Sequence, residues 1–402
     1  MKVMQINCVY NKGSTGKIMC DIHKGLLENG IESVICYGRG ADTTDKNVYK
    51  TCSEFYAKLN NLLSRITGLM HGGCFFSTNK LISIIKKEKP DVVHLHCING
   101  YFVNIYRLVS WLKKSKIKTV LTLHAEFMHT ANCGYALDCD KWKSGCGNCP
   151  RLKEETKSWL FDGTHKSFVK MQKAFEGFEN LTVVSVSPWL KDRAEQSPIL
   201  KGKNHTVVLN GLNTEIFKIY DTRELRKKHG IEENEKVIFH ATSSFSDDPN
   251  HIKGGYYVLE LAKALPHVRF IVAGNYDKSI ELPENMIMLG TVTDQVELAK
   301  YYSMADLTVI ASKKETFSMI CAESLCCGTP IIGFVAGGPE AISIKEFSSF
   351  VEYGNIEKLK EAAENLLMLK TEFNTKEISL SAQEKYNKNH MLNSYLDVYK
   401  NH

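Results

Sequence analysis

The sequence lacks several features that would assign it to a class at once. None of its apolar runs approaches the ~18 residues that a membrane-spanning helix needs. It contains no internal repeat, low-complexity run or long linker. No aromatic-basic pattern or known nucleic-acid-binding motif is present, so we expect no nucleic-acid partner. The start, Met1 to Asn7, enters an expected strand without a signal peptide's apolar stretch, which predicts a cytoplasmic protein.

The composition that is present is typical of a globular protein with two domains. Hydrophobic residues make up 43% and charged residues 24% of the 402 residues, which suits two α/β domains of roughly 200 residues each. The thirteen cysteines are an odd number, and many lie beside core residues. They favour a reducing compartment over a disulfide scaffold.

Charge is distributed unevenly along the chain. Residues 1–210 hold 30 Lys and Arg against 18 Asp and Glu, whereas residues 211–402 hold 21 against 27. A basic first half could rest on an anionic membrane surface, with the protein peripheral on its inner face. Ordinary solvation of helix faces is the alternative explanation.

Residues 306–340 carry the most informative pattern. An apolar run of strand length, Leu307 to Ala311, is followed by a polar turn and then by helical spacing up to Cys327. Ile331 to Val335 reads as a second buried strand, which predicts a strand–helix–strand unit and a parallel sheet. Glu315 lies in the loop after the first strand, where open α/β sheets bind ligands, and Glu323 lies two turns into the helix.

This segment resembles the signature of retaining glycosyltransferases with the GT-B fold, the large family with two glutamates eight residues apart. The matching positions are Glu315, Glu323, Gly328, Pro330, Gly337, Gly338 and Glu340. The resemblance implies that Glu315 binds donor-sugar hydroxyls, that Glu323 binds the ribose, and that the amides of Gly337 and Gly338 face the donor diphosphate. It also implies that the segment ending at Val292 meets the nucleotide base, and that no catalytic metal is needed.

The family resemblance implies the architecture as well. We expect an α/β protein with two facing Rossmann-like domains and a deep cleft between them. Residues 1–210 would bind the acceptor and include a cysteine-rich insert at 126–150, and residues 211–380 would bind a UDP- or GDP-sugar. Residues 381–402 would form a helix that packs back on the first domain. The acceptor would be a glycan or a lipid-linked glycan, and a bacterial surface polysaccharide is our expectation for the product.

The first half contributes four further candidates, one glycine-rich turn and three single residues. Gly13 and Gly16 lie in a glycine-rich turn that opens a helix and matches the family's loop near the diphosphate. His124 ends the run Thr-Leu-His and matches a family histidine beside the sugar and acceptor. His96, at the end of an earlier strand, could be functional or simply a core residue. Glu126 stands near the place of a family aspartate and could substitute for it.

The second half matches the family's diphosphate-binding cations only in part. Lys253, followed by glycine, matches the lysine, but Thr242–Ser244 occupies the place of the expected arginine. A missing cation matters because the leaving group carries developing charge. Lys313, Lys314 or Arg39 could replace it. The gap also leaves open a catalytically silent nucleotide-sugar-binding subunit, and a nucleotide-sugar epimerase is the other alternative.

Four cysteines directly follow the His124 region. Cys133, Cys139, Cys146 and Cys149 fall within 17 residues, and the last pair has the spacing of a zinc knuckle. Four thiolates would satisfy a tetrahedral structural zinc ion, although free or redox-active thiols are the alternative. A similar cysteine-bearing insert occurs in a subset of the resembled bacterial polysaccharide enzymes.

Residues 56–70 show apolar residues at helical spacing, with Lys58 and Arg65 on the polar face. Such an amphipathic helix either packs its apolar face on the sheet, which we take as the more ordinary outcome, or lies on a membrane surface.

Overall fold

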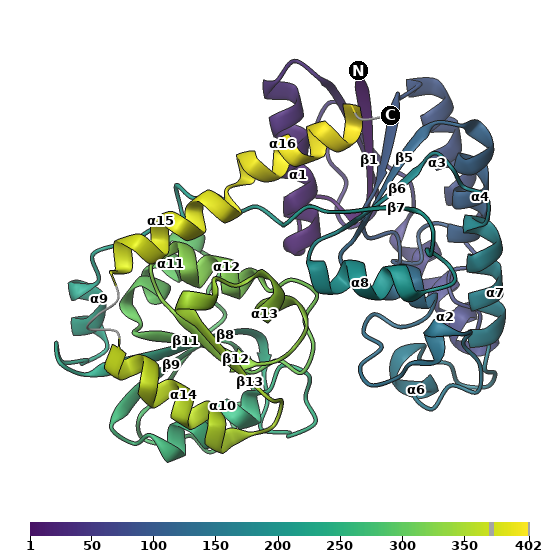
Figure 1. Ribbon diagram of the computed structural model, residues 1–402. Helices are drawn as coiled ribbons and strands as arrows, with labels where there is room; N and C mark the ends of the chain where they lie inside the picture. Colours follow the sequence, from purple (N-terminus) through teal and green to yellow (C-terminus); the bar gives the residue numbers. More distant parts are fainter. Residues whose placement is uncertain (370–373, 401–402) are drawn as a thin grey trace. The chain divides into compact units, whose positions relative to one another are not determined.

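The structure is a computed structural model that describes residues 1–369 and 374–400 (Figure 1). The chain forms two compact units, one of residues 1–209 with the described residues from Leu392 onwards, the other Asn210–Met391. Each unit contains a parallel sheet with helices on both faces, so the predicted pair of Rossmann-like domains is confirmed.

In the described part of the first unit, a seven-stranded sheet has the order β3-β2-β1-β4-β5-β6-β7. Its strands are β1 (Lys2–Val9), β2 (Glu32–Arg39), β3 (Val48–Lys50), β4 (Val92–Leu95), β5 (Lys118–Leu123), β6 (Leu181–Ser185) and β7 (Asn204–Val207). Every residue of β4 and β6 is buried, as expected for parallel strands covered on both faces.

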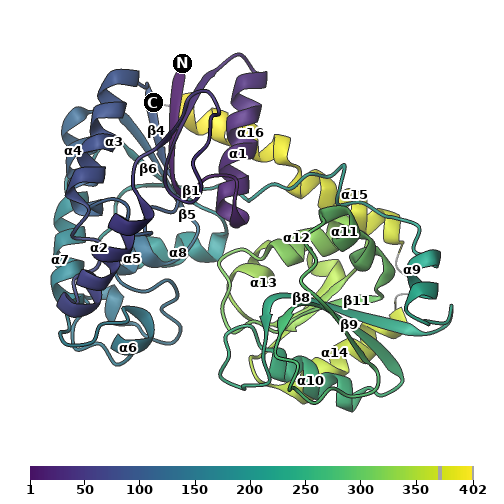
Figure 2. The same ribbon diagram turned by 180° about the vertical axis from the view of Figure 1, so that it is seen from behind.

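The helices of the first unit cover both faces of this sheet. They are α1 (Gly13–Glu28), α2 (Glu54–Thr67), α3 (Phe75–Glu88), α4 (Ile105–Ser115), α5 (Phe127–Thr130), α6 (Leu152–Glu155), α7 (Thr164–Phe175) and α8 (Pro188–Gln196), with a 3-10 turn at Lys141–Lys143. Figures 1 and 2 show α3, α4 and α7 on one face and α1 on the other. The glycine-rich turn expected at Gly13 and Gly16 forms the first turn of α1, which begins at Gly13.

In the described part of the second unit, a six-stranded sheet has the order β10-β9-β8-β11-β12-β13. Its strands are β8 (Lys236–Phe245), β9 (Val268–Tyr276), β10 (Met286–Gly290), β11 (Leu307–Ile310), β12 (Ile331–Phe334) and β13 (Ser348–Val351). Its helices are α9 (Arg223–Lys228), α10 (Gly255–Ala264), α11 (Gln295–Met304), α12 (Met319–Cys326), α13 (Gly338–Ile342), α14 (Ile356–Leu369) and α15 (Thr375–Tyr386), with a 3-10 turn at Lys345–Phe347.

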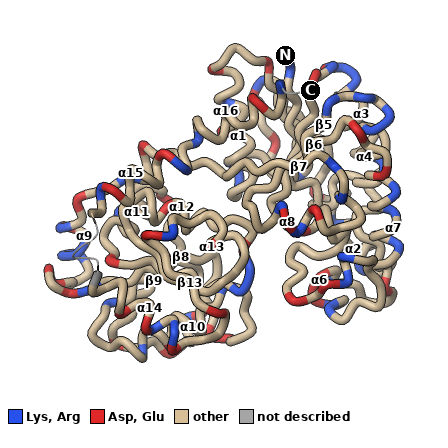
Figure 3. The backbone as a smooth tube through the Cα atoms, viewed as in Figure 1, with Lys and Arg blue, Asp and Glu red and all other residues tan. Residues whose placement is uncertain are grey.

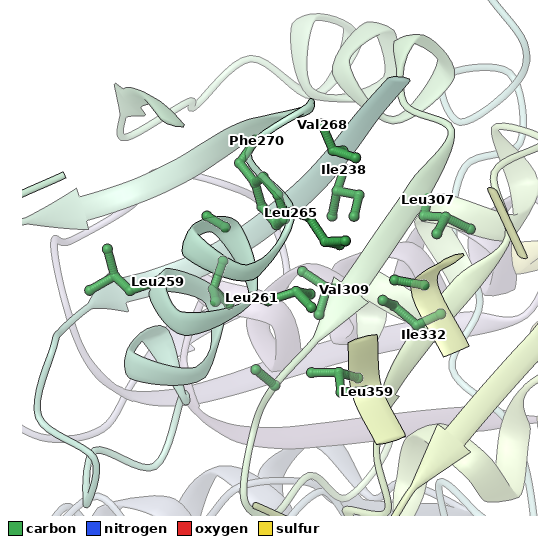
Figure 4. Close-up of a cluster of buried hydrophobic side chains, with 14 of the residues drawn as sticks. Ile238, Leu259, Leu261, Leu265, Val268, Phe270, Leu307, Val309, Ile332 and Leu359 are labelled. Atoms are coloured by element: carbon green, nitrogen blue, oxygen red, sulfur yellow. The ribbon is translucent and has the colours of Figure 1, made fainter. Parts of the chain in front are cut away.

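The core of the second unit joins its sheet to α10 and α14 (Figure 4). Ile238 and Val309 from neighbouring strands meet Leu261 of α10, and all three are fully buried. Burying such side chains contributes about 1.5–3 kcal/mol each relative to exposure. This layer anchors the strands whose ends carry the candidate site.

The end of the chain divides between the units. Helix α15 stays with the second unit, where Ser379 Oγ donates to the Cys326 carbonyl at 2.5 Å. Helix α16 (Lys388–Lys400) belongs to the first unit from Leu392 onwards. There Tyr395 and Tyr399 hydrogen-bond to Thr122 and His94. The tail expected to begin at residue 381 therefore reaches the first unit only after Met391.

Candidate functional site

The candidate residues of the second unit gather where its strand order reverses. Strand β8 has β9 on one side and β11 on the other, and all three run parallel. Open α/β sheets bind ligands at the carboxyl end of such a switch point. Lys253 follows β8 and Glu315 follows β11 at this edge.

Lys253 and Glu315 form a direct ion pair. Lys253 Nζ lies 2.6 Å from Glu315 Oε1, and the two side chains are 29% and 14% exposed. The turn that presents Lys253 requires glycine at residue 254, since φ is +69° and an added Cβ would lie 2.0 Å from the Ala311 carbonyl. The fold therefore positions a cation and an acid together, although they are 62 residues apart.

The loop after β12 is closed by its own hydrogen bonds. Gly337 N donates to Glu340 Oε1 at 2.6 Å, and Ala336 N donates to Glu340 Oε2 at 3.0 Å. Gly338 N donates to the Glu315 carbonyl at 2.8 Å. This corrects the expectation that the Gly337 and Gly338 amides face a diphosphate, because both already have protein acceptors. The lack of a side chain at Gly338 lets the two loops pack closely, since a Cβ there would lie 2.5 Å from Phe317 N.

Glu323 has a partner that the sequence did not indicate. Tyr302 of α11 donates its hydroxyl to Glu323 Oε2 at 2.9 Å. Burial, together with the Glu323 charge, raises the pKa of Tyr302 well above its usual value, so the phenol remains a donor. Ser318, which caps α12 by accepting from Cys321 N, has φ +80°, an uncommon conformation for a residue with a side chain. No local sequence signal marks Tyr302 or Ser318.

The first unit presents its candidates at the corresponding sheet edge. Its strand order reverses between β1 and β4. Gly13 has φ +65° and begins α1 directly after β1, and a Cβ at Gly16 would lie 3.2 Å from the Val9 carbonyl. His96 and His124 follow β4 and β5.

Three histidines form a connected, largely buried series. His96 Nδ1 lies 3.2 Å from His124 Nε2, and His96 Nε2 lies 3.1 Å from Gln5 Oε1. The ring of His94, which sequence reasoning did not select, lies 3.9 Å from that of His96 between centroids. Burial lowers the pKa of His124 to about 4, so it is neutral near pH 7. A neutral half-buried imidazole can bond a hydroxyl as donor or acceptor.

Glu126 does not substitute for the family aspartate. It is fully buried, with Oε1 at 2.5 Å from Arg193 Nε and 3.3 Å from His129 Nε2, and Oε2 accepts from Ala136 N at 2.7 Å. Burial would raise the pKa of this carboxyl, but these bonds and the Arg193 charge lower it below its usual value. Glu126 therefore anchors the start of the cysteine-rich insert.

All four insert cysteines line one small cavity of about 20 Å³, beside the buried Trp142. Within residues 1–369 and 374–400, however, no group of three or more metal-ligating side chains is arranged to hold an ion. Cysteine thiolates are ligands that zinc prefers, so the residue types of Cys133, Cys139, Cys146 and Cys149 suit this metal. Their side chains are not arranged around a common point as metal ligands would be.

Two of the proposed replacements for the missing arginine have other partners. Arg39 pairs with Glu54, with Nη2 at 2.8 Å from Oε2. Lys313 Nζ lies 5.7 Å from the centre of the Tyr353 ring. Strand β8 includes Thr242–Ser244, the residues that stand in place of the arginine, and it continues to Phe245.

Val292, the residue expected near the nucleotide base, follows the end of β10 and is half-buried.

The two domains and their switch-point residues define a GT-B type glycosyltransferase, and comparison with known proteins supports this class. Sucrose-phosphate synthase from Thermosynechococcus elongatus superposes with a TM-score of 0.68 over 99% of this chain and 98% of its own, at 14% identity. HepE of Anabaena in complex with UDP superposes with a TM-score of 0.67 over the full length of both chains, also at 14% identity.

Family models cover most of the sequence. The model of Glycosyltransferase Family 4 matches residues 16–216, and that of Glycosyl transferases group 1 matches residues 221–386. A full-length relative, 23% identical over all of both chains, is a protein of Escherichia coli K12 provisionally named as the colanic acid biosynthesis glycosyl transferase WcaC. The chain belongs to the glycosyltransferases of these families.

Proposed function

We propose that the protein transfers a sugar from a nucleotide-sugar donor to a glycan or lipid-linked acceptor, with retention of anomeric configuration. The observation that carries this proposal is the Lys253–Glu315 pair at the switch point of the second domain. UDP bound to HepE and the name of WcaC support a UDP-sugar and a bacterial surface polysaccharide.

In the proposed reaction, the bond between the sugar C1 and the diphosphate breaks, and a bond from C1 to the acceptor oxygen forms on the same face. The acceptor proton passes to the departing diphosphate oxygen. Lys253 stabilises the charge that develops there, and Glu315 holds the ammonium in place while binding sugar hydroxyls. No residue in this scheme requires a catalytic metal.

The remaining residues take supporting roles. Glu323, oriented by Tyr302, binds the ribose, and the segment at Val292 meets the base. The first turn of α1, with Gly13 and Gly16, offers backbone amides to phosphate. His124 serves the sugar and acceptor as a neutral hydrogen-bonding group.

A screen of UDP- and GDP-sugars by thermal shift identifies the donor, because only a ligand of the folded state raises the melting temperature. Mass spectrometry of the reaction with that donor then separates the alternatives. Transfer or donor hydrolysis supports the proposal. An isomerised donor without any acceptor indicates an epimerase. Binding with neither reaction indicates the silent subunit that the missing arginine leaves open.

A further inference from the structure

Helix α2 buries its small and polar side chains and exposes its large apolar ones, which is the reverse of the usual arrangement. Its buried residues are Ala57, Asn60 and Ser64, which are small or polar. Its large apolar side chains face solvent, with Phe55 79% and Leu63 49% exposed. The prediction that this helix packs its apolar face on the sheet is therefore wrong. Polar contacts hold the other face, for example Asn60 Oδ1, which accepts from Cys74 N at 2.8 Å.

Two distant segments extend this apolar surface. At the start of α3, Phe75 and Phe76 are 51% and 79% exposed, and the Phe76 ring lies 6.0 Å from that of Tyr56 in α2. At the other end of α2, exposed residues 159–161 are attached by a hydrogen bond from Trp159 N to the Arg65 carbonyl at 2.7 Å. We define residues 55, 59, 62–63, 75–76 and 159–161 as the apolar patch. Contiguous exposed apolar surface of this kind marks an interaction site.

Positive charge adjoins the apolar patch on α2 and beside Phe75, while Glu54 and Asp162 stand next to it in the sequence. Lys58 and Arg65 flank the exposed stripe of α2, and the Arg65 guanidinium lies 5.9 Å from the Trp159 ring. Phe75 also borders a surface groove of about 530 Å³ whose charged lining is entirely cationic: Arg107, Lys113, Lys114, Lys170 and Lys173. Figure 3 shows this run of Lys and Arg along α4 and α7.

We propose that the apolar patch and the adjoining cationic groove dock the first domain onto an anionic lipid bilayer. Apolar and aromatic side chains would enter the headgroup boundary, while the lysines and arginines contact anionic headgroups. A two-fold dimer through this surface is disfavoured, because it would bring the same cations of two copies together. The inference deepens the proposed function, since a lipid-linked acceptor lies in such a membrane, yet docking itself requires no turnover.

Vesicle sedimentation tests the docking surface directly. At physiological salt, the full chain should bind vesicles of phosphatidylcholine with 30% phosphatidylglycerol at least ~10-fold more tightly than pure phosphatidylcholine, and Trp159 fluorescence should shift to the blue. The triple variant Leu62→Ser, Phe76→Ser, Trp159→Ser should lose at least ~10-fold in binding. Arg107→Gln with Lys114→Gln and Lys170→Gln should lose a similar amount on anionic vesicles only.

A matched triple variant controls for lost hydrophobicity and folding. Leu27→Ser, Val296→Ser and Leu380→Ser remove exposed apolar side chains elsewhere (48%, 38% and 67% exposed) and should bind vesicles like the wild type. Absence of vesicle binding by the wild type, equal binding to neutral vesicles, or full binding by the patch variant would overturn the proposal. So would a dimer that the patch variant dissociates. Vesicle binding without sugar transfer would refute only the proposed function.

Discussion

At the residue scale, the Lys253–Glu315 pair is the centre of the chemistry we propose. The two side chains come from loops after neighbouring strands and meet at 2.6 Å. Each holds the other in place, so removing one changes both the charge and the position of its partner. Their effects on turnover should therefore be strongly coupled.

We expect Glu315→Gln and Lys253→Met each to lower kcat/KM at least ~100-fold, as loss of electrostatic groups in active sites does. The loss of kcat/KM in the double variant should be much smaller than the product of the two single losses, because each single change already disables the pair. Steady-state kinetics with the identified donor measures this cycle. Lys263→Met, which breaks an exposed pair with Glu260, is the control and should retain full activity. Near-wild-type turnover by Glu315→Gln would exclude the assignment.

At the element scale, the cysteine-rich insert is attached through buried charge. Glu126 is fully buried at the start of α5, and its oxygens are occupied by Arg193, His129 and the Ala136 amide. The Arg193 guanidinium also lies 4.7 Å from the Trp142 ring centre. These contacts attach the first part of the insert, up to Trp142, to α8.

Arg193→Met should lower the free energy of unfolding by about 3–5 kcal/mol, because it leaves a buried carboxylate without its cation. The double variant Arg193→Met, Glu126→Gln should recover part of this loss, because it also removes the charge of the buried carboxylate. Urea denaturation at pH 7 gives both values. Lys191→Met, which removes the half-exposed i,i+4 pair with Glu195 on the same helix, is the control and should cost less than about 0.5 kcal/mol. A loss that small for Arg193→Met would contradict the role of the buried pair.

The insert is also where we expect zinc. Metal analysis of protein purified under reducing, chelator-free conditions should find about one zinc per chain, and chelation should lower the melting temperature. Cys146→Ser with Cys149→Ser should abolish the metal. Cys8→Ser with Cys97→Ser, which changes two half-buried thiols outside the insert, should keep it. Less than about 0.2 zinc per chain in the wild type would refute the expectation.

At the scale of the whole molecule, each domain buries histidine away from water. Burial lowers the pKa of His71 in the first unit to about 3 and that of His240 in the second to about 4. In the unfolded chain these groups titrate near 6.5. The unfolded state therefore takes up protons first as the pH falls, which draws the equilibrium towards unfolding.

Stability should consequently decrease from about pH 6.5 to about pH 4, with His71 alone accounting for about 2 kcal/mol between pH 7 and pH 5. His71→Phe retains the ring contacts with Tyr101 and Phe127 and should reduce that decrease. Urea midpoints at the two pH values measure the effect. His390→Phe, at a histidine whose side chain is exposed, is the comparison and should leave the decrease unchanged. An equal decrease in His71→Phe would rule out this linkage.

In the described part of the chain, no helix is long and apolar enough to cross a bilayer. The docking that we propose for the apolar patch involves the surface of a bilayer. Such binding depends on both apolar area and electrostatic attraction, so salt should weaken it.

The sequence alone determined the two α/β domains and the residues that follow the central strands, because alternation of apolar runs and loops is a local property. The family resemblance assigned both Lys253 and Glu315 to the donor site before any coordinates, and for Glu315 its place after a buried strand pointed the same way. The tertiary structure determined the hydrogen-bond and ion-pair partners. The Gly337 and Gly338 amides donate to the Glu340 side chain and the Glu315 carbonyl, and Glu126 forms an ion pair with Arg193. It also decided that α2 turns its apolar face outward. Periodicity shows that a helix has two faces, but only the contacts made by distant segments determine which one is buried.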